Sequence, residues 1–324
     1  MAHAIRIHQT GGPEVMRYEE VTVGPPAAGE ARVRNTAIGL NFIDAYYRSG
    51  LYPMQLPFAL GSEGAGVVEA VGTGVDWVKP GDRVAYCTGP LGSYSTERNM
   101  PADKLVKLPD GIPERVAACL MLKGLTTQYL FRQTHRLQAG ETILFHAAAG
   151  GVGTIACQWA RALGVTMIGT VGSDAKAEVA RSNGCAHTIV YTRENFVDRV
   201  KEITGGKGVP VVYDGVGKDT FPASLDCLQP RGLFVSFGNA SGPIAAFSIG
   251  LLAQKGSLYA TRPTLAGYAT TRQALTAMAN EMFELVLAGK IKMEPRQTFA
   301  LKDAAEAHRA LAARETMGAT VLVP

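Results

Sequence analysis

The segment that most constrains this chain's fold is a glycine-rich loop, residues 146–153 (HAAAGGVG). Residues 141–149 have the apolar character of a buried strand, and residues 152–163 repeat apolar side chains at helical spacing. A glycine-rich loop that joins a strand to a helix is typical of a βαβ unit in a parallel sheet. We therefore expect the middle of the chain to form an α/β domain around this loop.

The same loop carries a cofactor signal. Read from Ala148, it is A-x-G-x-x-G, one residue away from the dinucleotide fingerprint G-x-G-x-x-G. Gly150 would let the backbone approach a pyrophosphate, and Gly153 would let the helix pack close to the sheet. The N–H groups at the start of the helix would face the phosphates. The alternative interpretation is a strand-to-helix turn that holds no ligand.

The regions on either side of the loop differ in pattern. From about residue 124 strands alternate with helices, which predicts a doubly wound parallel sheet; the strands are expected at 165–171, 187–191, 209–213, 233–237 and 257–261, and the helices at 175–182 and 221–228. Up to about Pro109 the chain reads as short strands, including 31–37, 61–71 and a strand through Val84 and Tyr86 that follows the Pro80-Gly81 turn.

The last sixty residues form a third region. We expect a helix at 270–288, then a second helix that ends near Gly318 and a final strand at 319–323. Asp303 is expected to cap the second helix, with Glu306 placed as in a capping box. No internal repeat or low-complexity linker is visible.

Composition excludes several classes of protein. A length of 324 residues predicts two domains, and 47% apolar with 19% charged residues is an ordinary globular balance. The net charge of +4 comes from scattered basic residues, so a nucleic-acid surface is not indicated. No apolar run approaches eighteen residues, so no membrane span is expected. The five cysteines never form C-x-x-C and the N-terminus lacks a signal pattern, which favours reduced thiols in a cytoplasmic protein.

The choice of dinucleotide is indicated by the end of the second strand. An NAD site usually carries an acid there, about 20 residues after the loop, but here the strand ends at Gly172-Ser173. Asp174 follows slightly later and is interpreted as the cap of the next helix. Ser173, Lys176 and Tyr191 can together hold a 2′-phosphate, which favours NADPH. Two alternatives stay open: Lys176 is only a solvated helix residue, or Asp174 reaches the ribose and NADH competes.

Two further residues near the loop are interpreted structurally. His146 precedes the loop on a buried strand, and we expect a hydrogen-bonded core histidine rather than a catalytic one. Cys157, on the helix after the loop, is expected to pack in the core.

Four segments occur in the order typical of one superfamily: GSEGAGVVEAVG, KPGDRV, KGLTTQYL and AAAGGVG. With these segments the chain resembles the medium-chain dehydrogenase/reductase superfamily. GLNFID at 39–44, RSGLYP at 48–53 and VSFGNASG at 235–242 make it most similar to the zinc-independent quinone oxidoreductase, or zeta-crystallin-like, branch. The resemblance implies a Rossmann NADPH-binding domain (124–263) inserted in a GroES-like β-rich catalytic domain (1–123 plus 264–324). It also implies a homodimer, whose sheet edge would be 257–261.

The resemblance also implies that zinc is missing. Zinc members of the superfamily use a cysteine, a histidine and a second cysteine or acid, and here Asn41, Ser62 and Leu122 take these places. Glu63 and Asp44 remain nearby, and we expect them to form salt bridges. Without a Lewis acid the acceptor must already be electrophilic, as quinones and enones are.

The resemblance assigns the candidate site residues. Asn41, Tyr46 and Tyr52 are the catalytic candidates that contact the acceptor, with packing (both tyrosines) or a turn (Asn41) as the alternatives. The cofactor-binding candidates are Phe42, Ile43, Asp44, Ala45, Tyr46, Tyr129, Gly150, Gly151, Val152, Gly153, Gly172, Ser173, Asp174, Lys176, Tyr191, Val216, Phe237, Gly238, Asn239, Ala240, Ser241, Pro263, Thr264, Leu265 and Arg314. The alternative interpretation of Arg314 is a helix C-terminal charge that interacts with the dipole, and the family's terminal lysine is Ala319 here.

Three hypotheses about function follow. The leading one is an NADPH-dependent quinone reductase that transfers hydride without zinc. The second is an NADPH-dependent enone or enal reductase with the same hydride geometry. The third, from another class, is an RNA-binding or structural zeta-crystallin-like protein, although no stripe of basic and aromatic residues supports it.

Overall fold

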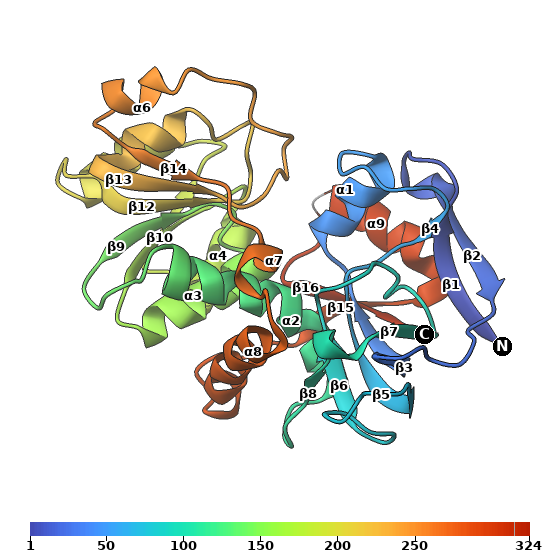
Figure 1. The fold of residues 1–324 in the computed structure, drawn as a ribbon. Coiled ribbons are helices and arrows are strands. Elements are labelled where there is room, and N and C mark those ends of the chain that lie inside the picture. Colours follow the sequence, from blue (N-terminus) through green and yellow to red (C-terminus); the bar gives the residue numbers. More distant parts are fainter. Residues whose placement is uncertain (314) are drawn as a thin grey trace. The chain divides into compact units, whose positions relative to one another are not determined.

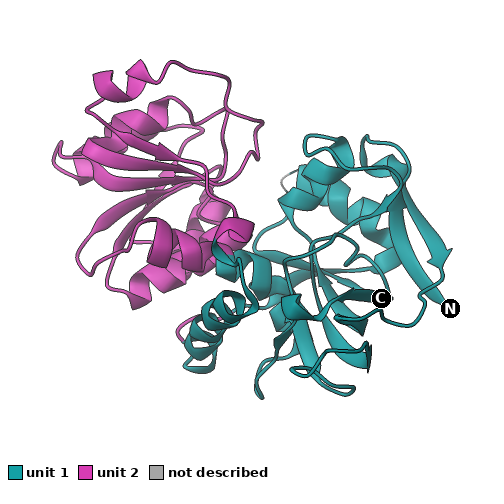
Figure 2. Ribbon diagram, in the orientation of Figure 1, with its two compact units in different colours: residues 1–125, 268–289, 293–324 teal, residues 126–267, 290–292 magenta. Residues whose placement is uncertain are grey.

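A computed structural model describes residues 1–313 and 315–324, and it divides into two compact units (Figure 2). Unit 1 comprises residues 1–125, 268–289 and 293–324, and unit 2 comprises residues 126–267 and 290–292. Arg314, a candidate site residue, lies outside the described residues. In the described parts of the chain, none of the helices has the length and apolar character needed to cross a membrane.

Unit 2 is built on a parallel sheet (Figure 1). Its described strands lie in the order β11-β10-β9-β12-β13-β14, and every pair is parallel. Their bounds are Thr142–Phe145 (β9), Thr166–Val171 (β10), His187–Val190 (β11), Val209–Asp214 (β12), Leu228–Ser236 (β13) and Tyr259–Thr261 (β14). The direction of winding reverses between β9 and β12, where open α/β sheets bind their ligands. Ile143, Leu144 and Phe145 are all buried, so both faces of β9 are covered.

Helices join these strands. They are α3 (Gly151–Ala162), α4 (Asp174–Ser182), α5 (Phe196–Ile203), α6 (Gly250–Gln254) and α7 (Leu265–Tyr268), of which α7 begins in unit 2. Helix α3 has the predicted apolar face, because Ile155, Ala156, Trp159 and Ala160 are at most 1% exposed. The alternation of parallel strands and helices confirms the predicted Rossmann fold class.

Two predictions for unit 2 were wrong in detail. The strand expected at 141–149 ends at Phe145, because Ala147 takes a left-handed conformation (φ 58°) that turns the chain toward α3. The helix expected at 221–228 is a 3-10 turn at Ala223–Cys227. Pro222 has no N–H to donate and Leu228 already pairs with Val209 in the sheet, so only a short turn fits between them.

Unit 1 is rich in β structure. Its larger sheet has the order β15-β16-β3-β5-β6-β8, with β7 also paired to β3, and its smaller sheet has the order β2-β1-β4. The bounds are Ala2–Ile7 (β1), Met16–Val21 (β2), Glu30–Gly39 (β3), Phe58–Ala59 (β4), Glu63–Val71 (β5), Arg83–Tyr86 (β6), Glu97–Pro101 (β7), Val106–Lys107 (β8), Pro295–Ala300 (β15) and Ala319–Val323 (β16). Strand β16 pairs with both β15 and β3, so the tail completes a sheet whose other strands lie within residues 30–107.

The helices of unit 1 include α1 (Phe42–Ser49), the start of α2 (Glu114–Tyr129), α8 (Arg272–Leu287) and α9 (Ala304–Ala312). The predicted capping box at α9 was wrong: Asp303 precedes the helix, but its side chain makes no capping hydrogen bond. A 3-10 turn at Leu301–Asp303 leads directly into α9, so Asp303 lacks the extended backbone of a capping residue. Helix α9 also ends at Ala312, earlier than predicted.

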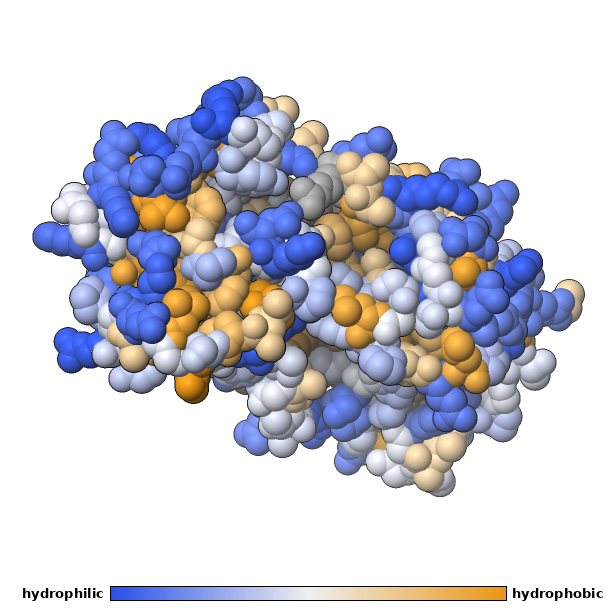
Figure 3. All heavy atoms as spheres, turned by 90° about the horizontal axis from the view of Figure 1, so that it is seen from above, coloured by the Kyte–Doolittle hydropathy of each residue, from blue (hydrophilic) through white to orange (hydrophobic). Residues whose placement is uncertain are grey.

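On the face shown in Figure 3, hydrophilic and hydrophobic residues are interspersed. Four of the exposed large apolar side chains lie within one stretch of unit 1: Phe42, Leu51, Met54 and Leu56 are 39–41% exposed. This stretch includes α1, which contains Tyr46; Asn41 directly precedes the helix and Tyr52 follows it.

Candidate active site

The glycine loop of unit 2 has the geometry of a dinucleotide cradle. Gly150 precedes α3, and a Cβ atom there would lie 3.2 Å from the carbonyl oxygen of Ala147. A Cβ on Gly153 would lie 2.4 Å from the same oxygen, closer than real Cβ contacts, so only glycine fits. The N–H groups that begin α3 come directly after this loop, together with half-buried Gly151 and Val152. Such a helix start favours a phosphate group.

The ends of β10 and β11 lie next to each other, because the two strands pair in parallel. Ser173 caps α4 by accepting a hydrogen bond from the backbone N–H of Lys176 (3.3 Å). The prediction that Asp174 caps this helix was therefore wrong, because Asp174 is already the first helical residue. Its carboxylate instead accepts two hydrogen bonds from Arg193, at 2.5 and 2.6 Å, and this guanidinium lowers the pKa of Asp174.

Tyr191 lies against the connection from β10 to α4. A Cβ added to Gly172 would lie 2.9 Å from the Tyr191 hydroxyl oxygen, so the ring covers the glycine. The structure thus brings together Gly172, Ser173 and Tyr191, three of the residues predicted to bind the cofactor. Tyr191 is 43% exposed and its hydroxyl stands next to the start of α4.

A third loop group follows β12 and β13. Gly238 packs on Gly215, where an added Cβ would lie 2.5 Å from the Gly215 carbonyl oxygen. The Ser241 hydroxyl donates to the Val216 carbonyl oxygen at 2.9 Å. Val216 and the segment 237–241, which were predicted to contact the cofactor, therefore form one contiguous surface of unit 2.

Sequence reasoning missed the residue that organises this third group. Asp214 is fully buried, and its Oδ1 atom accepts hydrogen bonds from the backbone N–H groups of Val216 (2.8 Å) and Gly217 (2.9 Å). Its Oδ2 atom accepts from the hydroxyls of Thr220 (2.7 Å) and Ser224 (3.2 Å). An acid at the end of a buried strand, followed by G-x-G, is the signal that could have revealed it.

His146 is the buried, hydrogen-bonded histidine that was predicted. Its side chain is 1% exposed, with Nδ1 2.8 Å from the Thr170 hydroxyl and Nε2 3.0 Å from the Ser224 hydroxyl. Because Ser224 donates to Asp214 or to Thr220, its oxygen accepts from His146, which places the proton on Nε2. Burial lowers the pKa of His146, so the ring is neutral and structural. Cys157 is also fully buried, as predicted.

In unit 1, Asn41 lies in a buried polar cluster with Lys123 and Glu63. The Lys123 ammonium donates to Asn41 Oδ1 (2.8 Å) and lies 3.2 Å from Glu63 Oε2. Asn41 Nδ2 donates to Glu63 Oε2 (2.8 Å) and to the Gly39 carbonyl oxygen (3.3 Å). The side chains of Lys123 and Glu63 are only 7% and 0% exposed. The salt bridge predicted for Glu63 is confirmed, whereas its partner Lys123 was missed.

Asp44 differs from the prediction. Its fully buried carboxylate forms hydrogen bonds rather than a salt bridge: it accepts from the Asn41 backbone N–H (2.9 Å), the Ser62 hydroxyl (2.7 Å) and the Tyr94 hydroxyl (3.0 Å). Burial raises the pKa of Asp44 to about 6, against the lowering effect of these hydrogen bonds. The Asp44 side chain thus anchors the start of α1.

The two tyrosine candidates lie at the other end of α1. The rings of Tyr46 and Tyr52 meet edge to face with centroids 5.3 Å apart, and Tyr52 makes a second such contact with Tyr47 at 5.6 Å. The Tyr52 backbone N–H donates to the Tyr46 carbonyl oxygen at 3.1 Å. Both candidates are half-buried, so each ring combines packing with an exposed part.

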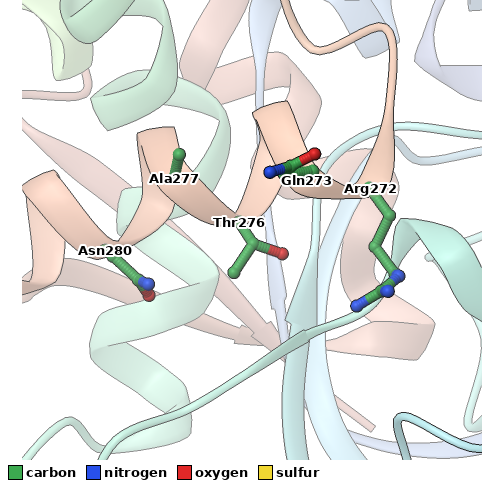
Figure 4. Close-up of a pocket in the computed structure, with 5 residues that line it drawn as sticks. All are labelled: Arg272, Gln273, Thr276, Ala277 and Asn280. Atoms are coloured by element: carbon green, nitrogen blue, oxygen red, sulfur yellow. The ribbon is translucent and has the colours of Figure 1, made fainter.

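Of the remaining candidates, Ile43 and Ala45 are half-buried in unit 1. In unit 2, Tyr129 is 3% exposed, Pro263 and Leu265 are buried and Thr264 is exposed. In the described ranges, no group of three or more histidine, cysteine, aspartate or glutamate side chains is arranged to hold a metal ion. A groove of about 450 Å³ lies elsewhere in unit 1, along Arg272, Gln273, Thr276, Ala277 and Asn280 on one side of α8 (Figure 4). It contains none of the candidate site residues.

A Rossmann unit with this loop and a GroES-like unit in the same chain define a dinucleotide-dependent oxidoreductase. Residues 27–110 match the alcohol dehydrogenase GroES-like domain family, and residues 151–286 match the zinc-binding dehydrogenase family. The chain belongs to the quinone oxidoreductase branch of the medium-chain dehydrogenase/reductase superfamily.

Three relatives support this assignment. The chain is 61% identical to a quinone oxidoreductase of Pseudomonas aeruginosa, over all of both chains. It is similar to the crystal structure of Escherichia coli quinone oxidoreductase complexed with NADPH, with 53% identity, a TM-score of 0.98, and 99% and 100% of the two chains covered. It is also 48% identical to a 2-haloacrylate reductase of a Burkholderia species, over 100% and 99% of the two chains.

Proposed function

We propose that the protein is an NADPH-dependent quinone reductase that transfers hydride to its acceptor without zinc. The observation that carries the proposal is the glycine cradle of unit 2, in a chain 61% identical to a quinone oxidoreductase along its whole length. A related protein of the same fold has been crystallised with NADPH, which supports the choice of cofactor.

The loops of unit 2 would hold this cofactor. Gly150 would let the backbone approach a pyrophosphate at the start of α3, where backbone N–H groups would stabilise its charge, and Gly153 lets α3 pack close to residues 147 and 148. Ser173, Lys176 and Tyr191 would hold the 2′-phosphate. Val216 and residues 237–241 would line the nicotinamide end, on the loop that Asp214 holds in place.

When bound, NADPH supplies the hydride. The residues of unit 1 then have to bind the acceptor and stabilise the negative charge on its oxygen. Asn41 is suited to this task because the Lys123 ammonium at its Oδ1 atom polarises the amide. Of the two Asn41 hydrogen bonds from Nδ2, the bond to Gly39 is the longer (3.3 Å), and an incoming carbonyl oxygen would replace it. Tyr46 and Tyr52 would contact the acceptor ring.

Zinc independence is supported by the residues at the positions of the zinc ligands. Asn41 donates a hydrogen bond to Glu63, and Ser62 donates one to Asp44. Leu122 has no side-chain group that binds zinc, and its backbone N–H donates to Glu63 at 2.7 Å. Tetrahedral zinc requires thiolate, imidazole or carboxylate ligands in a compact set. The side chains of Asn41 and Ser62 form hydrogen bonds with these carboxylates instead.

A second candidate function is favoured by one observation. The 48% identity to a 2-haloacrylate reductase, over whole chains, supports reduction of a conjugated carbonyl compound by the same hydride geometry. In that case the substrate would be an activated alkene rather than a quinone ring.

Steady-state oxidation of NADPH, followed at 340 nm, would test the proposal. We expect turnover with 1,4-benzoquinone that is faster than with a simple enone or with 2-chloroacrylate, and a slower rate when the transferred hydrogen of NADPH is deuterium. Oxidation with the enone or 2-chloroacrylate alone would show that the quinone assignment is wrong. A loss of activity after dialysis against 1,10-phenanthroline would contradict zinc independence.

The proposal extends to assembly. Strand β14 is the edge of the unit 2 sheet, and Tyr259 on it is 62% exposed. We propose that two copies form a homodimer through this edge, since an open strand pairs readily with an identical one. Light scattering coupled to gel filtration would test it, and a monomeric mass at micromolar concentration would contradict it.

A further inference from the structure

An exposed ion pair stands at the corner of unit 2 where the 2′-phosphate would bind. Asp174, the first residue of α4, pairs end-on with the guanidinium of Arg193, which follows β11 by three residues. The side chains of Asp174 and Arg193 are 69% and 58% exposed. Exposed pairs of this kind contribute little to folding stability, so stability alone does not explain this one.

The position of the pair relative to the cofactor residues is set by the sheet. Strands β10 and β11 are parallel and pair Val171 with Val190, so the loops that follow them leave the sheet side by side. The hydroxyl of Thr192, next to Arg193 in the chain, donates to the Gly172 carbonyl oxygen at 3.4 Å. Tyr191 covers the same glycine. Arg193 and Asp174 therefore flank the residues proposed to hold the 2′-phosphate.

The charge of Arg193 matters at this corner, because the carboxylate of Asp174 lies there too. A carboxylate beside a bound 2′-phosphate would repel it, and Asp174 is such a carboxylate unless a cation compensates for it. The two hydrogen bonds to Asp174 come from Nη1 and Nη2, the two nitrogens at the end of the guanidinium. The planar group has five N–H donors, so its side edge, with Nε, is suited to a phosphate at the same time.

We propose that Arg193 is a ligand of the cofactor's 2′-phosphate and determines the preference for NADPH over NADH, with Asp174 orienting its guanidinium. This inference rests on the proposed NADPH dependence of the protein. It assigns Arg193, which sequence reasoning did not single out, and changes the role of Asp174 from a possible ribose ligand to a positioning residue.

The test is a titration of each variant with NADPH and with NADH, followed by calorimetry. We expect Arg193→Ala to raise the Kd for NADPH about tenfold, the loss typical of one charge-assisted contact, and to leave the Kd for NADH unchanged. Arg193→Lys should keep part of the preference for NADPH, because the lysine ammonium still supplies a positive charge. Arg181→Ala is the matched control, because Arg181 forms an exposed pair with Glu178 on α4, the helix that begins with Asp174. This substitution should change neither Kd.

A double variant separates binding of the phosphate from mere neutralisation of Asp174. Arg193→Ala alone also leaves the Asp174 carboxylate without its cation, so adding Asp174→Ala should restore part of the NADPH affinity. If Arg193 contacts the phosphate, the double variant should still bind NADPH more weakly than the wild type. Recovery of wild-type affinity in the double variant would overturn the inference, and so would an Arg193→Ala protein that keeps its preference for NADPH. If the wild-type protein itself showed no preference, the proposed NADPH dependence would fail together with the inference. Thermal melts would verify that every variant is folded.

Discussion

His308 should make unit 1 sensitive to acid. This histidine lies on α9, is 1% exposed, and is fixed by two polar neighbours. Arg48 donates to its Nδ1 atom at 2.9 Å, so the proton of the neutral ring is on Nε2, 3.1 Å from the Tyr94 hydroxyl. Tyr94 in turn donates to Asp44. A proton added to Nδ1 would displace the hydrogen bond from Arg48 and place two cations in contact.

The size of the effect follows from the pKa of His308. Burial and the Arg48 charge lower this pKa from 6.5 to about 3. The unfolded chain therefore binds a proton that the folded protein does not, and stability is lost as pH falls from 6.5 toward 3. The full loss is about 5 kcal/mol, of which about 2 kcal/mol should be lost by pH 5.

The assay compares the wild type with His308→Gln across this pH range. The variant keeps a donor for Tyr94 but loses the acceptor for Arg48, so it should be about 1–2 kcal/mol less stable at pH 7.5. Both proteins carry Trp159→Phe, because Trp77 then reports on unit 1 alone. Urea unfolding followed by Trp77 fluorescence gives the free energy of unfolding at each pH.

The two curves should cross between about pH 5 and pH 6, and below the crossing the variant is the more stable protein. Other titrating groups are common to both proteins and cancel in the difference. A constant difference between pH 7.5 and pH 4.5 would refute the reasoning, because His308 would then take up its proton equally in the folded and unfolded states.

Three further changes have definite expected outcomes. Gly153→Ala places a Cβ 2.4 Å from a backbone carbonyl oxygen and should cost about 2 kcal/mol of stability and abolish NADPH binding, whereas Gly150→Ala, at 3.2 Å, should be milder in urea unfolding. Lys123→Met leaves the Glu63 carboxylate buried without its cation and should lower the free energy of unfolding by about 3–5 kcal/mol. Adding Glu63→Gln should restore part of this stability. If it restores none, an uncompensated charge is not the cause of the loss. Asp44→Asn removes a carboxyl whose pKa is raised from 3.8 to about 6, so the variant should gain about 2 kcal/mol of stability relative to the wild type as the pH rises from 4 to 6.5; a flat difference would show that Asp44 ionises normally.

The parts of the fold that the sequence predicted are those with short-range causes. The helix after the glycine loop was predicted because its apolar side chains recur at a fixed spacing, and Trp159 lies in the core accordingly. Choices between neighbouring residues were harder. Ser173 and Asp174 are both good capping residues, and only the path of the chain after β10 decides in favour of Ser173.

The site was predictable as far as single motifs reach. His146 and the glycine cradle were found because a strand and a loop define their surroundings. Lys123 was missed because its burial depends on Glu63, sixty residues earlier in the chain. No local sequence pattern indicates an ion pair between residues so far apart. Arg193 was missed for the same reason, since its partner Asp174 lies on a different strand-to-helix connection.

The pairing of β16 with both β3 and β15 has a consequence for the order in which the protein is made. Unit 2 is almost continuous in the chain, so most of it has left the ribosome before α8 is synthesised. Unit 1 is different: β3 is translated early, yet one of its partners arrives only with residues 319–323. During synthesis the end of β3 at Ile38 and Gly39 lacks its partner β16, and a nascent chain stalled before this strand would leave that end open to aggregation.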